Sequence, residues 1–229
     1  TPSHHDFLPV SLTYFVELQA VKSMQYSSPK NCSMRRIYLL ESRFLLGYER
    51  KLAKDFDSAA FVSETEANLF KQLAPEAATK VTYFNNGVDA DYFSPQNVYP
   101  NPYPAGIEAL VFVGAMDCWA NIDAVDWFAR SIFPAIRAQL PEVEFYIVGA
   151  RPTAEVMALT ALPGVTVTGS VPDVRPYLAH ASLAVAPLRI ARGIQNKVLE
   201  AMAMEKIVIA SPQAVEGIRA ARGQELLVA

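Results

Sequence analysis

Short apolar runs alternate with stretches of helical spacing along the second half of the chain. The runs are ALVFVGA, VEFYIVGA, VTVTG, SLAVAPL, IVIAS and ELLVA, and helical patterns lie between them at 121–139, 153–160, 173–180 and 191–206. Strands and helices that alternate in this way predict a parallel sheet with helices on both faces. Near-continuous apolar strands such as LVFV and LAVA indicate burial on both sides of that sheet. We therefore expect an α/β domain over residues 107–229.

The pattern before residue 85 predicts fewer elements. They are strands at 13–16, 58–62 and 81–84 and a long helix at 33–55, in which apolar residues recur close to the 3.6-residue period. Ser63 and Glu66 have the spacing of a capping box, which predicts a helix that begins there and runs through Leu73. These elements are too few to complete an α/β domain.

A run rich in Asn, Pro and Gly at 85–106 predicts a connection between two domains. We expect two Rossmann-like domains: residues 1–96 form the first together with the hinge, and residues 107–229 form the second. The first has too few strands, and no helix follows the strand ELLVA at the end of the second. We therefore expect an incomplete N-terminal domain and a C-terminal domain that lacks its last helices.

Composition and charge narrow the choice of function. The 229 residues are 52% hydrophobic and carry a formal net charge of −3, which is typical of a globular protein and gives no overall positive field for nucleic acid. Cys32 and Cys118 have no CxxC spacing, so we expect neither a disulfide framework nor a structural zinc site. No apolar run approaches the roughly 18 residues of a membrane span, and no signal-peptide pattern opens the chain. We expect a cytoplasmic protein that is soluble or attached only peripherally to the inner membrane.

The loop after SLAVAPL is the first candidate for chemistry, because ligands of open parallel sheets bind at the carboxyl ends of the strands. Gly193 lets the backbone approach a ligand, and the amides of the helix that follows favour an anion such as a diphosphate. Asn196, Lys197 and Glu200 share one face of that helix. A carboxylate at Glu200 can accept hydrogen bonds from two ribose hydroxyls. The alternative is that Gly193 merely ends a loop and Glu200 is a solvated acid.

This region resembles the donor-binding half of family 4 glycosyltransferases, which are retaining enzymes with two Rossmann-like domains (the GT-B fold). The matching segments are FVGAMDCWANIDAVDWF at 112–128, GSVPDVRPYLAHASLAVAPLR at 169–189 and GIQNKVLEAMAMEKIVIASPQAVEGI at 193–218. Upstream, ERKLAKDFDSAAFVSETEANLF and VTYFNNGVDADYFSP are similar to the end of the acceptor-side domain and the hinge. The subgroup that the chain resembles most is the sugar transferases of bacterial exopolysaccharide and PEP-CTERM/exosortase loci.

The resemblance implies a role for each matching residue. Glu200 matches the second acid of the family's motif of two glutamates separated by seven residues, and this acid binds the ribose of the nucleotide. Arg192 stands where the first acid is expected. In family members that share this departure, loop amides after the glycine hold the diphosphate, which points to Gly193, Ile194 and Gln195. Glu205 replaces an expected glycine at the end of the helix, where we expect a local cost because glycine relieves a left-handed turn.

Two basic residues lie nearest to the expected diphosphate. A cation at Arg189 or Lys197 would stabilise the leaving nucleoside diphosphate without a metal, so we take both as catalytic candidates. The alternative for each is a surface charge or a salt bridge. The helix at 33–55 is also basic and could contact anionic lipid, although a solvated helix face explains it too. Its basic residues are Arg35, Arg36, Arg43, Arg50, Lys51 and Lys54.

Other strand ends supply further donor-binding candidates. Gly114 and Asn121 line the loop after the first strand of the second domain, and Asn121 fits the N-cap of the helix that follows. Gly169 and Ser170 could bound the pocket for the base through backbone groups, although an ordinary turn also explains them. The family places Glu216 at the interdomain cleft, where it would contact the donor sugar.

These observations lead to one expected function and two alternatives. We expect a glycosyltransferase that transfers a hexose-type sugar from a UDP- or GDP-linked donor to a glycan or lipid-linked acceptor in exopolysaccharide or cell-surface polysaccharide biosynthesis. No cofactor or metal is expected beyond the donor. The catalytic histidine of many family members would lie upstream of Thr1, so we expect this fragment itself to be inactive. The alternatives are a nucleotide-sugar 2-epimerase of the same fold and a non-catalytic sugar-nucleotide-binding module.

Overall fold

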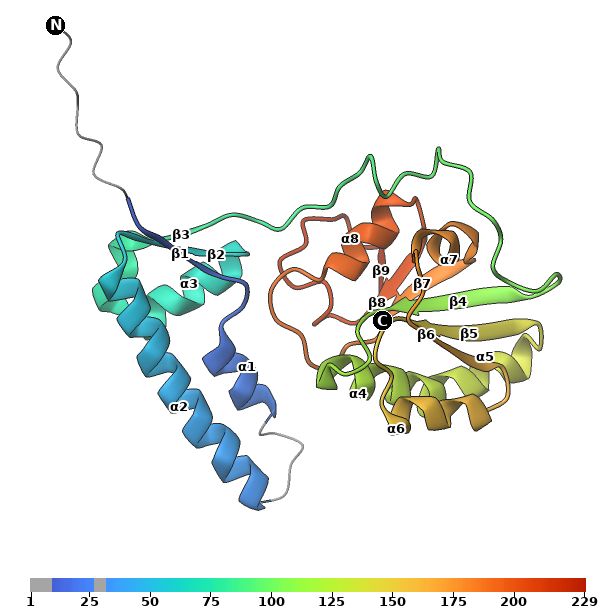
Figure 1. Ribbon diagram of the computed structural model, residues 1–229, viewed down its shortest axis with the longest axis horizontal. Coiled ribbons are helices and arrows are strands. Elements are labelled where there is room, and N and C mark those ends of the chain that lie inside the picture. The colour runs from blue at the N-terminus through green and yellow to red at the C-terminus, as the bar shows by residue number, and fades with distance from the viewer. Residues whose placement is uncertain (1–9, 27–31) are drawn as a thin grey trace, which may run out of the picture. The chain divides into compact units, whose positions relative to one another are not determined.

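The computed structural model describes residues 10–26 and 32–229 and divides into two compact units, residues 1–86 and 87–229 (Figure 1). Each unit encloses a hydrophobic core of its own around a parallel β-sheet, so the expected α/β class is confirmed. The division falls inside the Asn- and Pro-rich run and assigns residues 87–106 to the second unit. Among the described residues, no helix combines the length and the apolarity that crossing a membrane would require.

The first unit is built on a three-stranded parallel sheet in the order β1-β2-β3. Its elements are β1 (Leu12–Phe15), α1 (Gln19–Tyr26), α2 (Cys32–Asp55), β2 (Ser58–Phe61), α3 (Glu64–Leu73), the 3-10 helix η1 (Pro75–Lys80) and β3 (Val81–Tyr83). Phe15 lies opposite Phe61 in the sheet, and both rings pack with Phe70 of α3, with centroids 4.9 to 6.0 Å apart. The expected strands and the long helix are present, whereas the sequence pattern predicts no helix at α1.

Two buried carboxylates hold the start of α1. Glu66 Oε2 accepts a hydrogen bond from the Leu18 N–H at 2.6 Å, and Glu49 Oε1 accepts one from the Gln19 N–H at 2.8 Å. Ser63 Oγ accepts from the Glu66 N–H at 3.2 Å, which confirms Ser63 as the N-cap of α3. Within the described residues, Glu49 Oε2 is buried without a hydrogen-bond partner. Burial therefore raises the pKa of Glu49 to about 7.

The raised pKa of Glu49 predicts that the first unit loses stability as the pH rises from about 4.5 to about 7. In this window the native state keeps a proton that the unfolded chain has released, so the free energy of unfolding falls with pH and levels off above it. We expect Glu49→Gln, which is neutral throughout, to remove the slope. Hydrogen exchange of α1 and α2 peptides across a urea series, at pH 5 to 8, measures this. Glu64→Gln, an exposed acid on α3, should keep the wild-type slope, and an unchanged slope in Glu49→Gln would contradict the prediction.

The second unit is built on a six-stranded, fully parallel sheet in the order β6-β5-β4-β7-β8-β9. The strands are β4 (Glu108–Val113), β5 (Val143–Val148), β6 (Val165–Gly169), β7 (Leu183–Ala186), β8 (Val208–Ala210) and β9 (Leu227–Val228). All six coincide with the expected apolar runs. Buried parallel strands need apolar side chains on both faces, which is why their sequences stand out so clearly.

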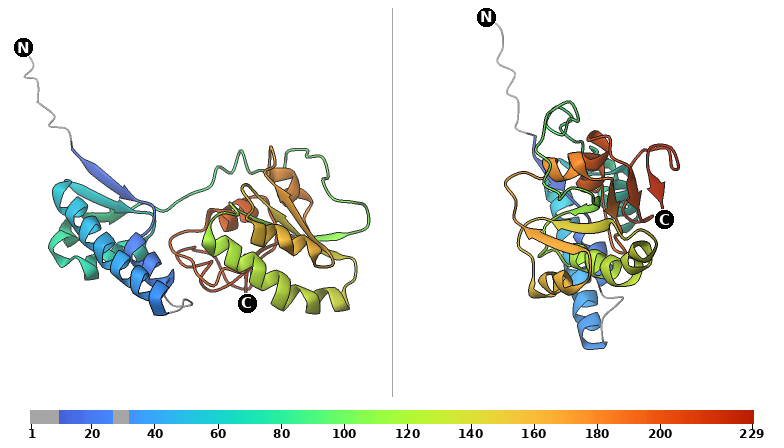
Figure 2. Two further views of the ribbon diagram at one scale, coloured as in Figure 1. Left: turned by 60° about the horizontal axis from the view of Figure 1, so that its bottom comes forward. Right: turned by 90° about the vertical axis from the view of Figure 1, so that its right-hand side faces the viewer.

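Helices cover both faces of this sheet (Figure 1). They are α4 (Trp119–Trp127), the π-helical turn η2 (Phe128–Ile132), α5 (Phe133–Gln139), α6 (Ala154–Met157), the 3-10 helix η3 (Ala158–Ala161), α7 (Arg175–His180) and α8 (Asn196–Ala203). Figure 2 shows α4, η2 and α5 as one continuous helical run. This run and α6 lie on one face of the sheet, and α7 and α8 lie on the other (Figure 1). The expected two-faced arrangement is confirmed.

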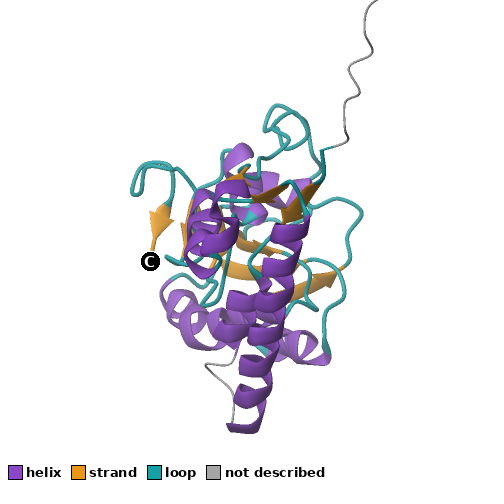
Figure 3. Ribbon diagram, turned by 90° about the vertical axis from the view of Figure 1, so that its left-hand side faces the viewer, coloured by secondary structure: helices purple, strands orange, loops and turns teal. Residues whose placement is uncertain are grey.

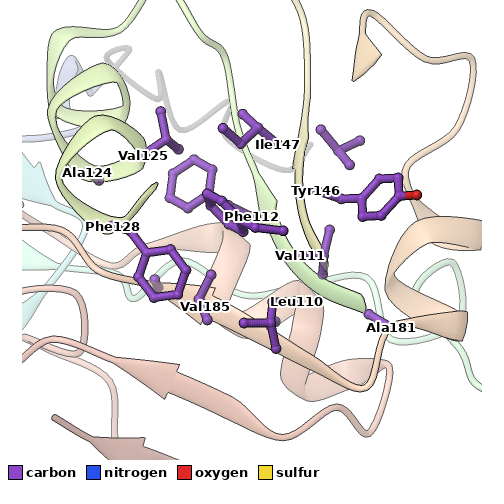
Figure 4. Close-up of a cluster of buried hydrophobic side chains, with 14 of the residues drawn as sticks. Leu110, Val111, Phe112, Ala124, Val125, Phe128, Tyr146, Ile147, Ala181 and Val185 are labelled. Atoms are coloured by element: carbon purple, nitrogen blue, oxygen red, sulfur yellow. The ribbon is translucent and has the colours of Figure 1, made fainter. Parts of the chain in front are cut away.

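Aromatic and branched side chains fill the space between β4, β5 and the α4 run (Figure 4). The Phe128 ring lies 4.7 Å from that of Phe145, centroid to centroid, and Phe133 lies 5.9 Å from the same ring. Phe112, Phe133 and Phe145 are at most 1% exposed. Their burial fixes the position of β4 and of the helix that follows it, and both elements lead to the site described below.

The segment before β4 is anchored to α7. The Tyr103 hydroxyl donates a hydrogen bond to the Tyr177 carbonyl oxygen at 2.7 Å, and His180 Nε2 lies 2.7 Å from the Tyr99 carbonyl oxygen. These contacts explain why residues 87–106 belong to the second unit.

Candidate functional site

The carboxyl ends of β4 and β7 mark the point of the sheet at which a ligand is expected. From β4 the chain continues outward through β5 and β6 and then returns to β7 on the other side of β4. The loops after β4 and β7 therefore diverge, and in open parallel sheets this divergence opens a crevice that receives ligands. The first loop contains Gly114 and leads to α4, and the second contains Gly193 and leads to α8.

Glycines allow the strand ends to approach each other closely at this edge. The Gly114 N–H donates to the Val148 carbonyl oxygen at 3.0 Å, and the Gly149 N–H donates to the Gly169 carbonyl oxygen at 3.2 Å. A Cβ on Gly149 would lie 1.7 Å from the Gly114 carbonyl oxygen, and one on Gly114 would lie 2.8 Å from Asn121 Nδ2. Only glycine fits at Gly149, and Gly114 leaves the room that the Asn121 side chain occupies.

Asn121 joins the two loops and is not an N-cap. The α4 helix begins at Trp119, because the Cys118 carbonyl oxygen already accepts from the Asn121 and Ile122 N–H groups at 3.0 Å each. The N-cap prediction for Asn121 is therefore wrong. Its side chain is buried, donates through Nδ2 to the Ala115 carbonyl oxygen at 2.9 Å and accepts through Oδ1 from Lys197 Nζ at 2.9 Å.

Lys197 and Glu200 lie one turn apart at the start of α8, and both are half-buried. The Lys197 ammonium lies 5.1 Å from the centre of the Phe112 ring, and burial lowers its pKa to about 8. Burial raises the pKa of Glu200, and the nearby charge of Lys197 opposes that rise. Within the described part of the chain, no side chain or backbone group donates a hydrogen bond to the Glu200 carboxylate. The site thus offers a cation and an acceptor that is available for a ligand.

The loop before α8 has the backbone geometry that its glycine predicts. Gly193 adopts a φ of +64°, the left-handed region that favours glycine. Gln195 occupies the N-cap position of α8, but its side chain accepts no hydrogen bond from a helix amide. Instead Gln195 Nε2 donates to the Arg192 carbonyl oxygen at 2.9 Å. Gly193 and Ile194 are buried and Gln195 is half-buried, so neither the side chains nor the amides of this loop are widely exposed.

Arg189 forms a salt bridge in the structure. Its Nη2 lies 2.5 Å from Asp123 Oδ1, its Nε lies 3.0 Å from Asp123 Oδ2, and its guanidinium lies 5.2 Å from the centre of the Trp127 ring. Because a bidentate carboxylate already neutralises this charge, Arg189 is a weaker candidate than Lys197 for stabilising an anion.

Arg192, which stands in the place of the family's first acid, contacts Glu216. Arg192 Nη1 lies 3.4 Å from Glu216 Oε1 in the loop after β8. Ser211 Oγ, at the end of β8, donates to the Leu188 carbonyl oxygen at 2.6 Å and so ties this loop to the one after β7. Glu205, at the end of α8, has a φ of +54°, which confirms the expected left-handed position without glycine.

The predicted site residues are brought together only in part. Asn121 and Lys197 are hydrogen-bonded to each other, Gly114 lies next to the Asn121 side chain, and Glu200 lies one turn further along α8. Gly169 and Ser170 lie at the end of β6, two strands away from β4 in the sheet. Asp123 and Trp127 were not predicted from the sequence, because their partner Arg189 lies far along the chain, and the contact of Asn121 with the Ala115 carbonyl oxygen was not predicted either.

Residues 108–229 match the family model described as glycosyl transferases group 1. This match spans more than half of the chain. The chain belongs to the glycosyl transferases group 1 family. A search of the curated proteins found no match.

Solved structures of glycosyltransferases share the fold. A glycosyltransferase from Rickettsia africae ESF-5 is 16% identical at a TM-score of 0.59, over 91% of this chain and 54% of that one. Anabaena HepE in complex with UDP and glucose is 15% identical at a TM-score of 0.64, over 95% and 57%. Sucrose-phosphate synthase from Thermosynechococcus elongatus is 19% identical at a TM-score of 0.69, over 95% and 54%. The chain spans about half the length of these proteins, and at such identities the likeness is one of GT-B fold.

Proposed function

We propose that this group 1 glycosyltransferase chain binds a UDP- or GDP-linked sugar and serves the transfer of a hexose-type sugar, with retention, to a glycan or lipid-linked acceptor. The observation that supports this most is the pair formed by Lys197 and Glu200 at the start of α8, beside the point where the loops after β4 and β7 diverge. HepE has been solved in complex with UDP and glucose and in complex with UDP-glucose.

The diphosphate of the donor is assigned to Lys197 and to the loop at Gly193, Ile194 and Gln195. When the bond between the sugar and the diphosphate breaks, negative charge grows on the leaving phosphate oxygen. An ammonium already held in place by Asn121 stabilises that charge without reorganising, and the amides at the start of α8 add to it. With a pKa of about 8, Lys197 is mostly protonated at neutral pH. This chemistry requires no metal or further cofactor.

The ribose of the nucleotide is assigned to Glu200. Its carboxylate is half-buried and has acceptor capacity that no described residue uses, so it can take hydrogen bonds from the two ribose hydroxyls. The remaining assignments follow from positions at strand ends and, for Glu216, from the family resemblance. Gly114 shapes the site by admitting Asn121, Gly169 and Ser170 bound the base, and Glu216, held by Arg192, contacts the donor sugar.

The biological setting is proposed from the subgroup that the sequence resembles. In that subgroup, bacterial sugar transferases of PEP-CTERM/exosortase loci act in exopolysaccharide biosynthesis. We place the reaction in the cytoplasm, at the inner face of the membrane where the acceptor is lipid-linked.

A non-catalytic sugar-nucleotide-binding module is the second candidate. The observation that favours it is Arg192, since a basic residue replaces the acid that the family uses on the donor sugar. Binding of a nucleotide sugar without transfer or hydrolysis by the full-length protein would select this candidate.

Thermal unfolding with a panel of nucleotides tests the proposed site. We expect one nucleoside diphosphate, UDP or GDP, and its sugars to raise the melting temperature of the chain. Glu200→Ala should lower the affinity about 10- to 100-fold, because hydrogen bonds to a charged group contribute about 1.5–3 kcal/mol. Glu155→Ala, an exposed acid in the first turn of α6, is the matched control and should bind as the wild type does. Equal binding by the wild type and Glu200→Ala would contradict the assignment of the ribose to Glu200. If no nucleotide raised the melting temperature, the proposed donor site would be contradicted.

A further inference from the structure

The long helix α2 of the first unit (Figure 3) carries an apolar stripe on one of its faces. Ile37, Leu40, Phe44 and Tyr48 follow one another at spacings of three, four and four residues, which places them on one face of a helix. They are 56%, 54%, 78% and 59% exposed, respectively. The opposite face of the helix carries Glu49 and Ala53, which are buried in the first unit. The stripe is therefore not the face of α2 that packs on the described part of the first unit.

Basic side chains border the stripe on one side. Arg36, Arg43 and Lys54 recur at spacings of seven and eleven residues, which places them in a row beside the apolar one, and Lys51 continues the apolar row itself. All four are exposed, and within the described residues none of them forms an ion pair. These cations are thus available for an external anion.

The acids of α2 form no ion pair with these four cations within the described residues. Glu49 is buried on the opposite face, whereas Glu41 and Asp55 are exposed and offset part of the positive charge. Arg50, by contrast, is neutralised by Glu76, with Nε 2.6 Å from Oε1. The outward face of α2 therefore combines exposed apolar side chains with a net positive charge.

We propose that the outward face of α2 docks the protein on a membrane surface that contains anionic lipids, with Ile37, Leu40, Phe44 and Tyr48 entering the headgroup region and Arg36, Arg43, Lys51 and Lys54 contacting lipid phosphates. A helix with an apolar face and a basic border lies in the plane of such an interface. A second copy of the chain fits this face less well, because a like-charged row would approach its own equivalent. The inference does not depend on the donor site, which lies in the second unit.

Vesicle cosedimentation tests the proposal on the whole chain. We expect the protein to sediment with vesicles of phosphatidylcholine and 30% phosphatidylglycerol at least tenfold more strongly than with phosphatidylcholine alone, and to be released by 0.5 M salt. Ile37→Ser combined with Phe44→Ser should lower the partition coefficient about tenfold or more. Arg36→Gln combined with Arg43→Gln should lower it severalfold and weaken its dependence on salt.

Two matched variants control for nonspecific effects. Val98→Ser removes an exposed apolar side chain from a loop, and Arg222→Gln removes an exposed cation, both in the second unit, and neither should change sedimentation. The melting temperature with bound nucleotide reports on the donor site separately in every variant. Equal sedimentation with neutral and anionic vesicles, or no loss in the stripe and row variants, would overturn the proposal. A concentration-dependent dimer that Phe44→Ser abolishes, without lipid binding, would overturn it in favour of self-association.

Discussion

Lys197→Met is expected to lower the affinity of the chain for its nucleoside diphosphate about 100-fold or more. Methionine keeps the length of the side chain and its packing on Phe112 but removes the ammonium that would contact the phosphates. A hundredfold loss corresponds to about 2.7 kcal/mol, which is the size expected for one or two hydrogen bonds to charged groups in a half-buried site. Isothermal titration with UDP and GDP measures it directly.

The same lysine gives the binding a dependence on pH. Because burial lowers the pKa of Lys197 to about 8, the free protein loses the ammonium as the pH rises through that value. The dissociation constant of the wild type should therefore rise above pH 8, by up to about tenfold per unit, while that of Lys197→Met should stay flat over the same range.

Two further variants distinguish the effect of the Lys197 charge from that of the hydrogen bond that positions it. Asn121→Ala removes the acceptor that holds the ammonium but leaves the charge, so its effect should be smaller than that of Lys197→Met. Lys71→Met, on α3 of the first unit, is the matched control for the loss of a positive charge. If Lys197→Met bound the nucleotide as tightly as Lys71→Met, the assignment of the diphosphate to Lys197 would be lost.

The sheet of the second unit could be predicted strand by strand because its information is local. The central strands β4, β5, β7 and β8 are largely buried, so their own sequences must be mostly apolar, whereas the edge strands β6 and β9 are only partly buried. The loop at Gly193 is local in the same sense. A backbone position with a left-handed conformation favours glycine, so glycine at residue 193, in the loop that leads to α8, predicts the local geometry.

The elements that could not be predicted depend on partners far along the chain. The start of α1 is held by the carboxylates of Glu49 and Glu66. They lie 30 and 48 residues along the chain from the residues whose N–H groups donate hydrogen bonds to them. The segment QAVKSMQY has only eight residues, and a helix of that length depends on tertiary contacts for its stability.

The candidate site shows the same limit. The bond between Lys197 and Asn121 spans 76 residues, and that between Arg189 and Asp123 spans 66. The residue types indicated an anion site, but which cation is free and which is already paired depends on where the α4 helix begins. The Cys118 carbonyl oxygen sets that start, three residues before the asparagine that the pattern favours as a cap.

Gly149→Ala is expected to destabilise the second unit by about 3 kcal/mol or more, or to prevent it from folding. The added Cβ would lie 1.7 Å from the Gly114 carbonyl oxygen, and both groups belong to backbone at adjacent strand ends, so neither can turn aside. The φ of +152° at Gly149 adds a conformation that residues with a Cβ rarely adopt.

Alanine substitutions at two other glycines distinguish the steric clash from the backbone strain. Gly169→Ala has a φ of +69° but open space around the new Cβ, so it should show the backbone strain alone, about 1 kcal/mol. Gly87→Ala has neither feature and should change the stability by less than about 0.5 kcal/mol. Urea unfolding followed by tryptophan fluorescence reports on the second unit, since Trp119 and Trp127 both lie there. Any folded Gly149→Ala protein must displace Gly114, and because Gly114 makes room for Asn121, its nucleotide affinity should fall as well. If Gly149→Ala lost no more stability than Gly169→Ala, the ends of β4 and β5 would separate easily. The close contact of Gly149 with Gly114 would then not hold Asn121 and Lys197 in a rigid position.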